Sequence, residues 1–337
     1  MKPKIFFMRG LLPEEEKEVR DVAEYTTCTA DEITPEIVAK ETKNADAISA
    51  RMRSYMFLDE RTLKNAKGLK VIDVETNTFD NGTFTRQGLD MNAATKLGIY
   101  VTNTPLDSEV MAEKTWGLLL SVALKIVEAD KFTREGRWKN RNTCEYYFLS
   151  HKIRDATLGI LGLGRIGKAV ASRAKAFNMR TIYYDVIRRE DVEKELNIEY
   201  VDFQNLLKRS DYVSVHTGPV HHLIGEKELG VMKKGAILIN TARGECVDTS
   251  ALFKALRENR IAGAGLDVFE KEPVDPQDPI LTLPNVVLMP HTIGGDLEQV
   301  LKLMRMSLAN ILNVINERMP LSLVNKEVVR IRPLRNR

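Results

Sequence analysis

Short apolar runs alternate with amphipathic stretches along the first hundred residues. The apolar runs predict buried strands, and apolar positions that recur every three or four residues predict helices. The strands are expected at 5–8, 47–49, 71–72 and 99–101, and the helices at 14–25 and 59–66. Strands that alternate with helices predict a parallel sheet whose strands are joined by crossover helices.

The same alternation returns later in the chain. A long helix is expected over 108–127, residues 130–155 are polar and irregular, and a second strand–helix series runs from Thr157 to Pro290. A final amphipathic helix is expected over 297–315. The 337 residues exceed the size at which one hydrophobic core usually keeps growing. The sequence therefore predicts two doubly wound α/β lobes.

Composition and charge exclude several classes of protein. Apolar residues make up 43% of the chain and charged residues 29%, which is typical of a globular protein. The net charge is +3 and the basic residues are scattered, so neither nucleic acid nor a membrane is an expected partner. The apolar runs are too short to span a membrane, and the N-terminus is charged too soon for a signal peptide. Cys28, Cys144 and Cys246 lie far apart, so no metal site is expected and the location is expected to be cytoplasmic.

A glycine motif after an apolar strand is the strongest local signal. In LGILGLGRIG, Gly162 permits a tight turn, Gly164 lets the backbone approach a pyrophosphate, and Gly167 permits close packing of the next helix. The next apolar run ends in Asp185, where a carboxylate can accept hydrogen bonds from both ribose hydroxyls. It would repel a 2′-phosphate, so NAD is favoured over NADP, although Arg188 and Arg189, which follow closely, keep NADP as an alternative.

Three later strand ends carry side chains that suit reduction of a 2-oxo acid. Arg243 can hold a carboxylate through two parallel hydrogen bonds and polarise the neighbouring carbonyl. His291 can donate a proton to the carbonyl oxygen, which is a common role of histidine, and a paired Glu272 would fix its ring. Taken singly, each has an ordinary alternative as a surface salt bridge, a solvated loop residue or a buried loop histidine. His221 and His222 are expected on a loop surface.

Together these motifs resemble those of the D-isomer specific 2-hydroxyacid dehydrogenase family. The resemblance covers nearly the whole chain and rests on LGILGLGRIG, YYD, LINTARGECVD, GLDVFEKEP, and MPH followed by IGG. It implies that Arg243 binds the substrate, that His291 is the acid/base and that Glu272 tunes it. Cofactor contacts are implied for Gly162, Gly164, Arg165, Ile166, Gly167, Asp185, Thr217, Thr241, Ala242, Asp267, His291 and Gly294.

The resemblance also implies a domain organisation. A Rossmann NAD-binding domain over 104–293 is expected to be inserted in a flavodoxin-like substrate-binding domain that comprises 1–103 and 294–337. The active site is expected in the cleft between the two lobes. Family members are typically dimers, so a homodimer through the 107–150 region is expected.

The chain departs from the family pattern where a glycine-rich loop usually holds the substrate carboxylate. Thr76, Asn77 and Thr78 stand there instead, and the segment 82–88 looks like an insertion. These side chains would hydrogen-bond a polyhydroxylated substrate, or the insertion only decorates the loop. The stretch after His216 is also short, which leaves the cofactor contact of Thr217 open.

The sequence therefore predicts an NAD-dependent oxidoreductase that interconverts a small 2-hydroxy acid and a 2-oxo acid by hydride transfer, with NADP as the less favoured cofactor. Two alternatives keep the same scaffold. One is a non-catalytic, NAD-binding protein of the corepressor type, and the other is an enzyme that oxidises another small anion, such as formate or phosphite.

Overall fold

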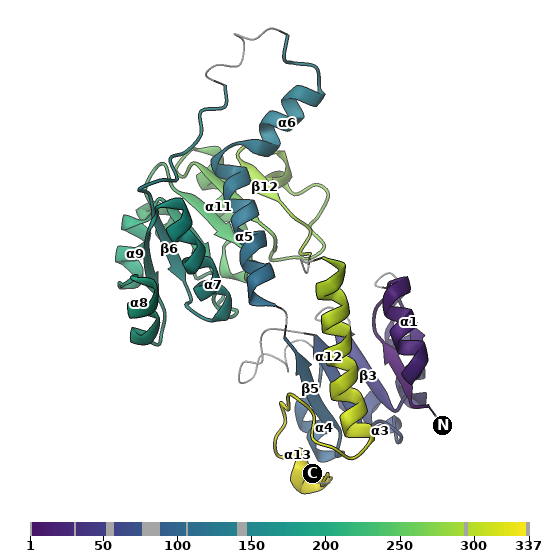
Figure 1. Cartoon of the computed structure of the whole chain (residues 1–337). Coiled ribbons are helices and arrows are strands. Elements are labelled where there is room, and N and C mark those ends of the chain that lie inside the picture. Colours follow the sequence, from purple (N-terminus) through teal and green to yellow (C-terminus); the bar gives the residue numbers. More distant parts are fainter. Residues whose placement is uncertain are drawn as a thin grey trace. The chain divides into compact units, whose positions relative to one another are not determined.

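The chain folds into two compact units (Figure 1), and the computed structural model describes residues 2–29, 32–51, 57–75, 88–105, 107–139, 147–292 and 296–334. The terminal unit comprises Met1–Asp107 and Gly295–Arg337, and the central unit comprises Ser108–Gly294. The central unit is thus inserted in the terminal unit. The sequence placed the boundaries after residues 103 and 293; the structure keeps residue 104 in the terminal unit because it still pairs in the last strand of that sheet.

A five-stranded parallel sheet forms the centre of the terminal unit. Its order, β2-β1-β3-β4-β5, is the flavodoxin-like order of a doubly wound sheet. The strands are β1 (Lys4–Phe7), β2 (Glu24–Thr27), β3 (Ala47–Arg51), β4 (Val71–Glu75) and β5 (Tyr100–Thr104). The helices of this unit are α1 (Pro13–Val22), α2 (Pro35–Asn44), α3 (Glu60–Asn65), α4 (Met91–Lys96), α12 (Leu297–Ile315) and α13 (Val328–Ile331).

Side-chain alternation along the strands builds a core on each face of this sheet. Ile5 and Phe7 belong to a buried cluster with Ile311 of α12. Phe6, between them in β1, belongs to a second cluster with Val38 of α2. Successive strand residues point to opposite faces, so a strand covered on both faces reads as one continuous apolar run. This is why the sequence marked β1 and β4 clearly.

The edge strand β2 is an element that the sequence missed in this unit, as are α2 and α4. The helix expected over 14–25 ends at Val22, and Glu24–Thr27 then pairs in parallel with β1. The residues of β2 are largely exposed, so no apolar run distinguishes them from a helix end. Backbone pairing with β1, which is a tertiary contact, decides the conformation.

The central unit contains a seven-stranded parallel sheet of order β12-β11-β10-β9-β6-β7-β8, which is the Rossmann order with one additional strand. Its strands are β6 (Thr157–Leu161), β7 (Arg180–Tyr184), β8 (Glu199–Tyr200), β9 (Tyr212–Val215), β10 (Ile237–Asn240), β11 (Gly263–Leu266) and β12 (Val286–Leu288). Its helices are α5 (Ser108–Ala123), α6 (Ile126–Arg134), α7 (Arg165–Ala174), α8 (Glu190–Leu196), α9 (Phe203–Arg209), α10 (Glu226–Val231) and α11 (Thr249–Arg257), with 3₁₀ turns η3 (Lys175–Phe177), η4 (Gly244–Cys246) and η5 (Pro279–Thr282). The expected fold class is confirmed. The strand order reverses at β6, which pairs with both β7 and β9, and this places the topological switch point there.

The helix expected over 108–127 is two helices. Lys125 adopts a left-handed conformation with φ 54°, which separates α5 from α6. In one continuous helix the Ala123 carbonyl would accept the N–H of Val127, but it accepts the N–H of His151 at 2.8 Å. α6 extends into the segment that the sequence read as irregular (Figure 1). Within the described part of the chain, no helix has both the length and the apolar character needed to cross a membrane.

Candidate active site

Most of the predicted site residues lie at the carboxyl ends of the strands of the central sheet. Neighbouring strands are all parallel, so these ends lie along one edge, where open α/β sheets bind ligands. The edge carries the glycine turn after β6, Asp185 after β7, Thr217 after β9, Thr241, Ala242 and Arg243 after β10, Asp267 and Glu272 after β11, and His291 after β12.

The glycine turn between β6 and α7 fits a dinucleotide. Gly162 has φ 91°, and a Cβ there would lie 2.7 Å from the carbonyl oxygen of His216. A Cβ on Gly167 would lie 2.1 Å from the Gly162 carbonyl oxygen, so only glycine lets α7 pack this closely. A Cβ on Gly164 would meet nothing within 4 Å, so there is open space before the first turn of α7. That turn has N–H groups without helical partners and a positive dipole end, which suit a phosphate.

Asp185 lies beside this turn and supports it. Its carboxylate accepts the N–H of Leu163 at 2.7 Å and the N–H of Ile187 at 3.2 Å. Arg188, which kept NADP open as an alternative, binds Glu193 through two hydrogen bonds of 2.9 and 2.8 Å. Arg188 holds the pKa of the Glu193 carboxyl down at about 2, with Tyr183 as the second donor. Arg188 is thus paired with a carboxylate of the following helix, α8.

His291 and Glu272 are brought together by the structure. Nδ1 of His291 lies 2.8 and 3.0 Å from the two carboxylate oxygens of Glu272. One of those oxygens also accepts the N–H of Phe269 at 2.9 Å, which orients the carboxylate. Both side chains are partly buried, at 24% and 20% exposure. His291 has φ 50°, which is the left-handed region that few residues other than glycine adopt.

Arg243 lies in a rigid turn after β10. Asn240, the last residue of that strand, accepts the N–H of Ala242 at 3.1 Å and donates its side-chain amide to the Arg243 carbonyl at 2.9 Å. A Cβ on Gly244 would lie 1.9 Å from the Phe269 carbonyl carbon, so this turn packs against the loop that carries Glu272. The sequence did not assign Asn240 a role, although an amide at a strand end just before a motif is a turn signal. β10 and β12 flank β11, so Arg243 and His291 follow the strands on either side of it.

Lys114 is a site-edge residue that the sequence missed. It lies in α5, and its ammonium contacts the Asp267 carboxylate at 2.7 Å. Both side chains are almost fully buried. Burial lowers the pKa of the Lys114 ammonium, and the charge of Asp267 partly offsets this. The helix pattern gave no signal for it, because a lysine in an amphipathic helix is usually solvated.

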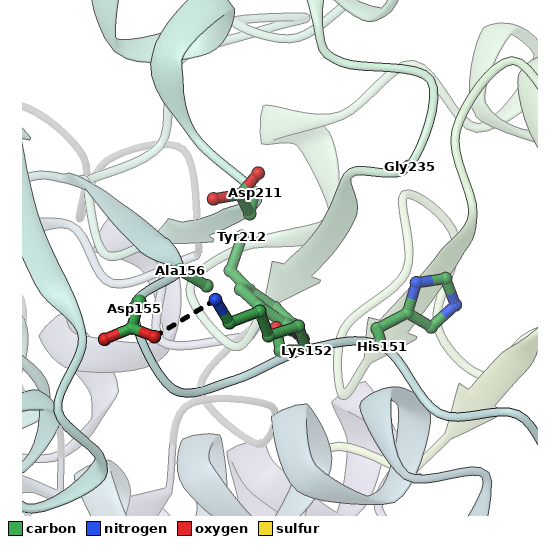
Figure 2. A pocket seen from close by; sticks show the side chains of 7 residues that line it. All are labelled: His151, Lys152, Asp155, Ala156, Asp211, Tyr212 and Gly235. Atoms are coloured by element: carbon green, nitrogen blue, oxygen red, sulfur yellow. Dashed lines mark hydrogen bonds and ion pairs between the residues drawn. The ribbon is translucent and has the colours of Figure 1, made fainter.

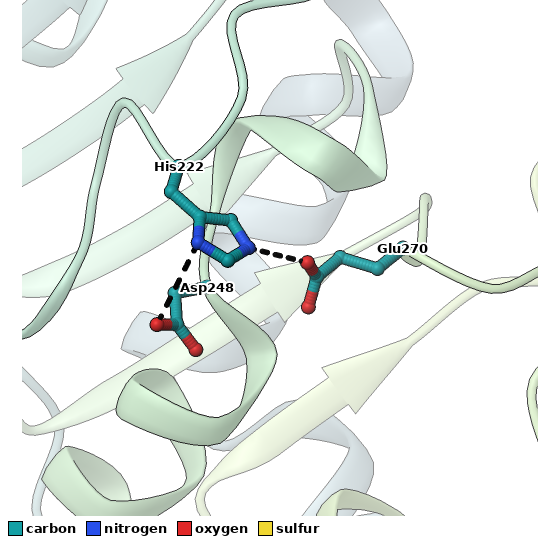
Figure 3. Close-up of side chains that lie close together, drawn as sticks. All are labelled: His222, Asp248 and Glu270. Carbon is teal, nitrogen blue, oxygen red and sulfur yellow. Dashed lines mark hydrogen bonds and ion pairs between the residues drawn. The ribbon is translucent and has the colours of Figure 1, made fainter.

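His222 has partners that the sequence did not predict. Figure 3 shows its ring between Asp248 and Glu270, with Nε2 at 2.6 Å from Glu270 and Nδ1 at 3.8 Å from Asp248. The ring therefore links two loops at the carboxyl edge of the sheet. The two carboxylates approach opposite ring nitrogens, and only the contact with Glu270 is within hydrogen-bond distance.

The remaining predicted residues divide into two groups. Arg165 and Ile166 begin α7, and the hydroxyl of Thr217 lies 3.8 Å from the thiol of Cys246. Outside the described residues lie the predicted substrate contacts Thr76, Asn77 and Thr78, the cofactor contact Gly294, and residues 82–87 of the insertion.

Two hollows of the central unit lie at the opposite edge of the sheet. One of about 180 Å³ is lined by residues such as Ala156, Asp211 and Gly235, which precede β6, β9 and β10 (Figure 2). A groove of about 870 Å³ is lined by Thr157 and Arg180, the first residues of β6 and β7. Neither is lined by a residue of the glycine turn. Because ligands of doubly wound sheets bind at the carboxyl ends, we do not assign the site to either hollow.

The central unit combines a glycine turn that fits a dinucleotide with Arg243, Glu272 and His291 at the ends of neighbouring strands. This combination indicates the class of nicotinamide-dependent oxidoreductases. The family model described as D-isomer specific 2-hydroxyacid dehydrogenase, NAD binding domain, matches residues 116–292. The chain is 42% identical over 341 residues to the glyoxylate reductase of Korarchaeum cryptofilum, an alignment that covers 99% of each chain. This protein therefore belongs to the D-isomer specific 2-hydroxyacid dehydrogenase family.

Solved structures give the same relationship. The TT0316 protein of Thermus thermophilus superposes with a TM-score of 0.86 at 34% identity, covering 95% of this chain and 99% of that one. The NADPH-dependent glyoxylate/hydroxypyruvate reductase of Sinorhizobium meliloti superposes with a TM-score of 0.81 at 27% identity, covering 100% of each chain. The predicted reaction class is confirmed: the protein interconverts 2-hydroxy and 2-oxo acids with NAD(P). These relationships do not support the corepressor or formate and phosphite alternatives.

Proposed function

We propose that this protein is an NADH-dependent reductase of glyoxylate and similarly small 2-oxo acids. The observation that carries this proposal is the contact between His291 and Glu272, beside the rigid turn that holds Arg243. NADH, when bound, would supply the hydride that reduces C2 of the oxo acid, and the carbonyl oxygen would take up a proton from the protein. The relatives are named as reductases of glyoxylate or of glyoxylate and hydroxypyruvate, which supports a small 2-oxo acid as the substrate.

His291 is the proton donor in this proposal. Its Nδ1–H is held by Glu272, so the ring is fixed and Nε2 is the atom that exchanges a proton with the substrate oxygen. The carboxylate stabilises the charged imidazole that must exist before proton transfer. A positioned acid of this kind contributes about 10²–10⁴-fold to the rate.

Arg243 binds the substrate carboxylate and polarises the carbonyl. A guanidinium is always charged and matches the two oxygens of a carboxylate in a planar fork. The Asn240 hydrogen bonds fix the backbone from which this side chain projects. Thr76, Asn77 and Thr78 complete the substrate site in this proposal, and Gly294, Thr217, Thr241, Ala242 and Asp267 contact the cofactor.

NAD is the preferred cofactor in this proposal. Asp185 lies at the end of β7, beside the glycine turn, where its negative charge disfavours a 2′-phosphate. Arg188 would have to leave the Glu193 carboxylate before it could bind such a phosphate.

A homodimer formed through α6 and the segment around residue 149 is part of the proposal. Large apolar side chains are exposed on this part of the central unit. They are Leu124, Ile126, Val127, Trp138, Tyr147 and Leu149. Exposed large apolar side chains that lie on one segment of the chain are typical of a protein interface. Light scattering of the purified protein tests it: a mass near 38.2 kDa would mean a monomer and contradict this part.

Cys28 and Cys246 have free, buried thiols, which supports the cytoplasmic location that we include in the proposal.

The test is NADH oxidation, followed at 340 nm, against glyoxylate, hydroxypyruvate, pyruvate and larger 2-oxo acids, with NADPH in parallel. We expect glyoxylate and NADH to give the highest kcat/KM. His291→Ala is expected to lower kcat by at least about 10²-fold while the Kd for NADH stays similar. Unchanged turnover in this variant would remove His291 from the mechanism. A preference for large 2-oxo acids would overturn the proposed substrate.

A further inference from the structure

A buried lysine at the edge of the site has no role in the reaction as described above. Lys114 lies in α5 with its side chain only 5% exposed. Burial of an ammonium is unfavourable unless the charge is paired and its hydrogens are bound. A methionine of similar length would fill the same volume but would leave the Asp267 carboxylate, which is 1% exposed, without its cation. The position therefore points to a role that requires the charge or the donor atoms.

The partners of Lys114 converge on one peptide segment. Its ammonium contacts one carboxylate oxygen of Asp267 at 2.7 Å and donates to the carbonyl of Thr292. The other oxygen of Asp267 accepts the N–H of Thr292 at 3.2 Å. The donor and the acceptor of the Thr292 main chain are thus both bound by one ion pair. These contacts join α5 to the end of β11 and to the segment after β12.

Thr292 directly follows His291. The φ of 50° at His291 is unfavourable for a residue with a Cβ and persists only where the surroundings hold the backbone in place. The contact between Nδ1 and Glu272 depends on this backbone, because the φ angle sets the direction in which the imidazole leaves the chain. An anchor one residue away is well placed to maintain that direction.

We propose that Lys114 is a positioning residue for His291: with Asp267 it clamps the Thr292 main chain and thereby keeps the imidazole in contact with Glu272. The inference rests on the proposed role of His291. Lys114 itself is not assigned any contact with the reacting atoms.

The experiment compares the rate of hydride transfer, in single-turnover reactions of excess enzyme with NADH and glyoxylate, across three substitutions. Lys114→Met removes the charge and the donors, Lys114→Gln keeps a neutral donor, and Lys114→Arg keeps the charge. Lys254→Met is the control, because it removes a largely exposed ion pair of the same unit, the one with Glu226. The Kd for NADH is measured for each variant by fluorescence.

Lys114→Met is expected to slow hydride transfer by about 10²-fold, the scale of a misplaced catalytic group. The rate should fall by a larger factor than the Kd for NADH rises, since the partner Asp267 is itself a proposed cofactor contact, and Lys114→Arg should recover most of the rate. Lys254→Met should leave both quantities unchanged. If Lys114→Met does not fold, the same comparison is made with Lys114→Gln, for which we expect a smaller loss in the same direction.

A double-mutant cycle separates positioning from a general effect on the fold. In the His291→Ala background, Lys114→Met should change the rate by no more than about twofold, because the group that it positions is gone. A full 10²-fold loss in that background would overturn the proposal. So would an unchanged rate in Lys114→Met, or a tenfold change in the Kd for NADH without a change in rate. Unchanged turnover in His291→Ala alone would instead overturn the proposed function.

Discussion

The loop after β11 carries two glutamates two residues apart, and the structure separates their roles. Glu272 contacts Nδ1 of His291, whereas Glu270 contacts His222 and accepts the N–H of Thr249. One carboxylate therefore belongs to the proposed acid/base pair, and the other joins two loops. At the residue scale this makes Glu270 a matched control for Glu272.

Replacement of Glu272 by Gln is expected to lower kcat by at least about tenfold. The neutral amide cannot stabilise the charged imidazole, so less of the enzyme holds the proton that the substrate needs. The KM for NADH should change little. Steady-state kinetics across pH 5 to 9 checks this. Glu270→Gln should keep kcat within about twofold, and equal losses in the two variants would contradict the assignment.

Asp185 is expected to set the choice of cofactor. Asp185→Ala removes the negative charge beside the glycine turn, so the ratio of kcat/KM for NADH to that for NADPH should fall by about tenfold or more. Because the carboxylate also accepts the N–H of Leu163, some loss with NADH is expected as well. The ratio is the informative quantity, and an unchanged ratio would show that Asp185 does not read the ribose.

At the scale of single elements, the packing of α7 on β6 depends on two glycines in different ways. A Cβ at Gly167 would collide with the main chain of Gly162, whereas a Cβ at Gly164 meets open space. Gly167→Ala should therefore destabilise the central unit by about 1–3 kcal/mol, the usual cost of overpacking. Thermal unfolding without cofactor measures this loss.

Gly164→Ala provides the matched comparison for the same helix. Its Cβ fits the protein, so the unfolding temperature should change little. The Kd for NADH should rise, because the methyl group occupies the space expected for the pyrophosphate. Tight NADH binding in this variant would mean that the phosphates do not bind at this turn.

At the scale of the whole molecule, the pH dependence of stability has a source in the terminal unit. Asp73 in β4 is fully buried and accepts hydrogen bonds from Thr102, Thr104 and Asn310. Burial raises the pKa of the Asp73 carboxyl to about 6, and the hydrogen bonds only partly oppose this. Between about pH 4 and pH 6 the folded protein holds a proton that the unfolded chain releases. The stabilisation that the protonated Asp73 gives to the folded protein is therefore present at low pH and is lost as the pH rises through about 6.

Replacement of Asp73 by Asn should remove this dependence. The contribution that disappears between pH 4 and pH 7 is about 3 kcal/mol, from the two-unit shift in pKa. Urea unfolding of both proteins at each pH checks it, and the difference in free energy of unfolding is the quantity to compare. Wild type should lose stability relative to Asp73→Asn as the pH rises, and a difference that is constant with pH would contradict the raised pKa.

The chain itself determined the class of fold, the glycine turn and the family. These depend on local patterns: apolar runs for strands covered on both faces, glycines where a Cβ would collide, and side chains at strand ends. It also determined where α12 begins and ends, because its apolar stripe is uninterrupted.

Tertiary structure decided what local patterns do not encode. Pairing with β1 made β2 a strand, the bond from His151 to Ala123 ended α5, and the ion pair with Asp267 buried Lys114. In each case the partner lies far away in the sequence, so only the folded chain brings the deciding contact together.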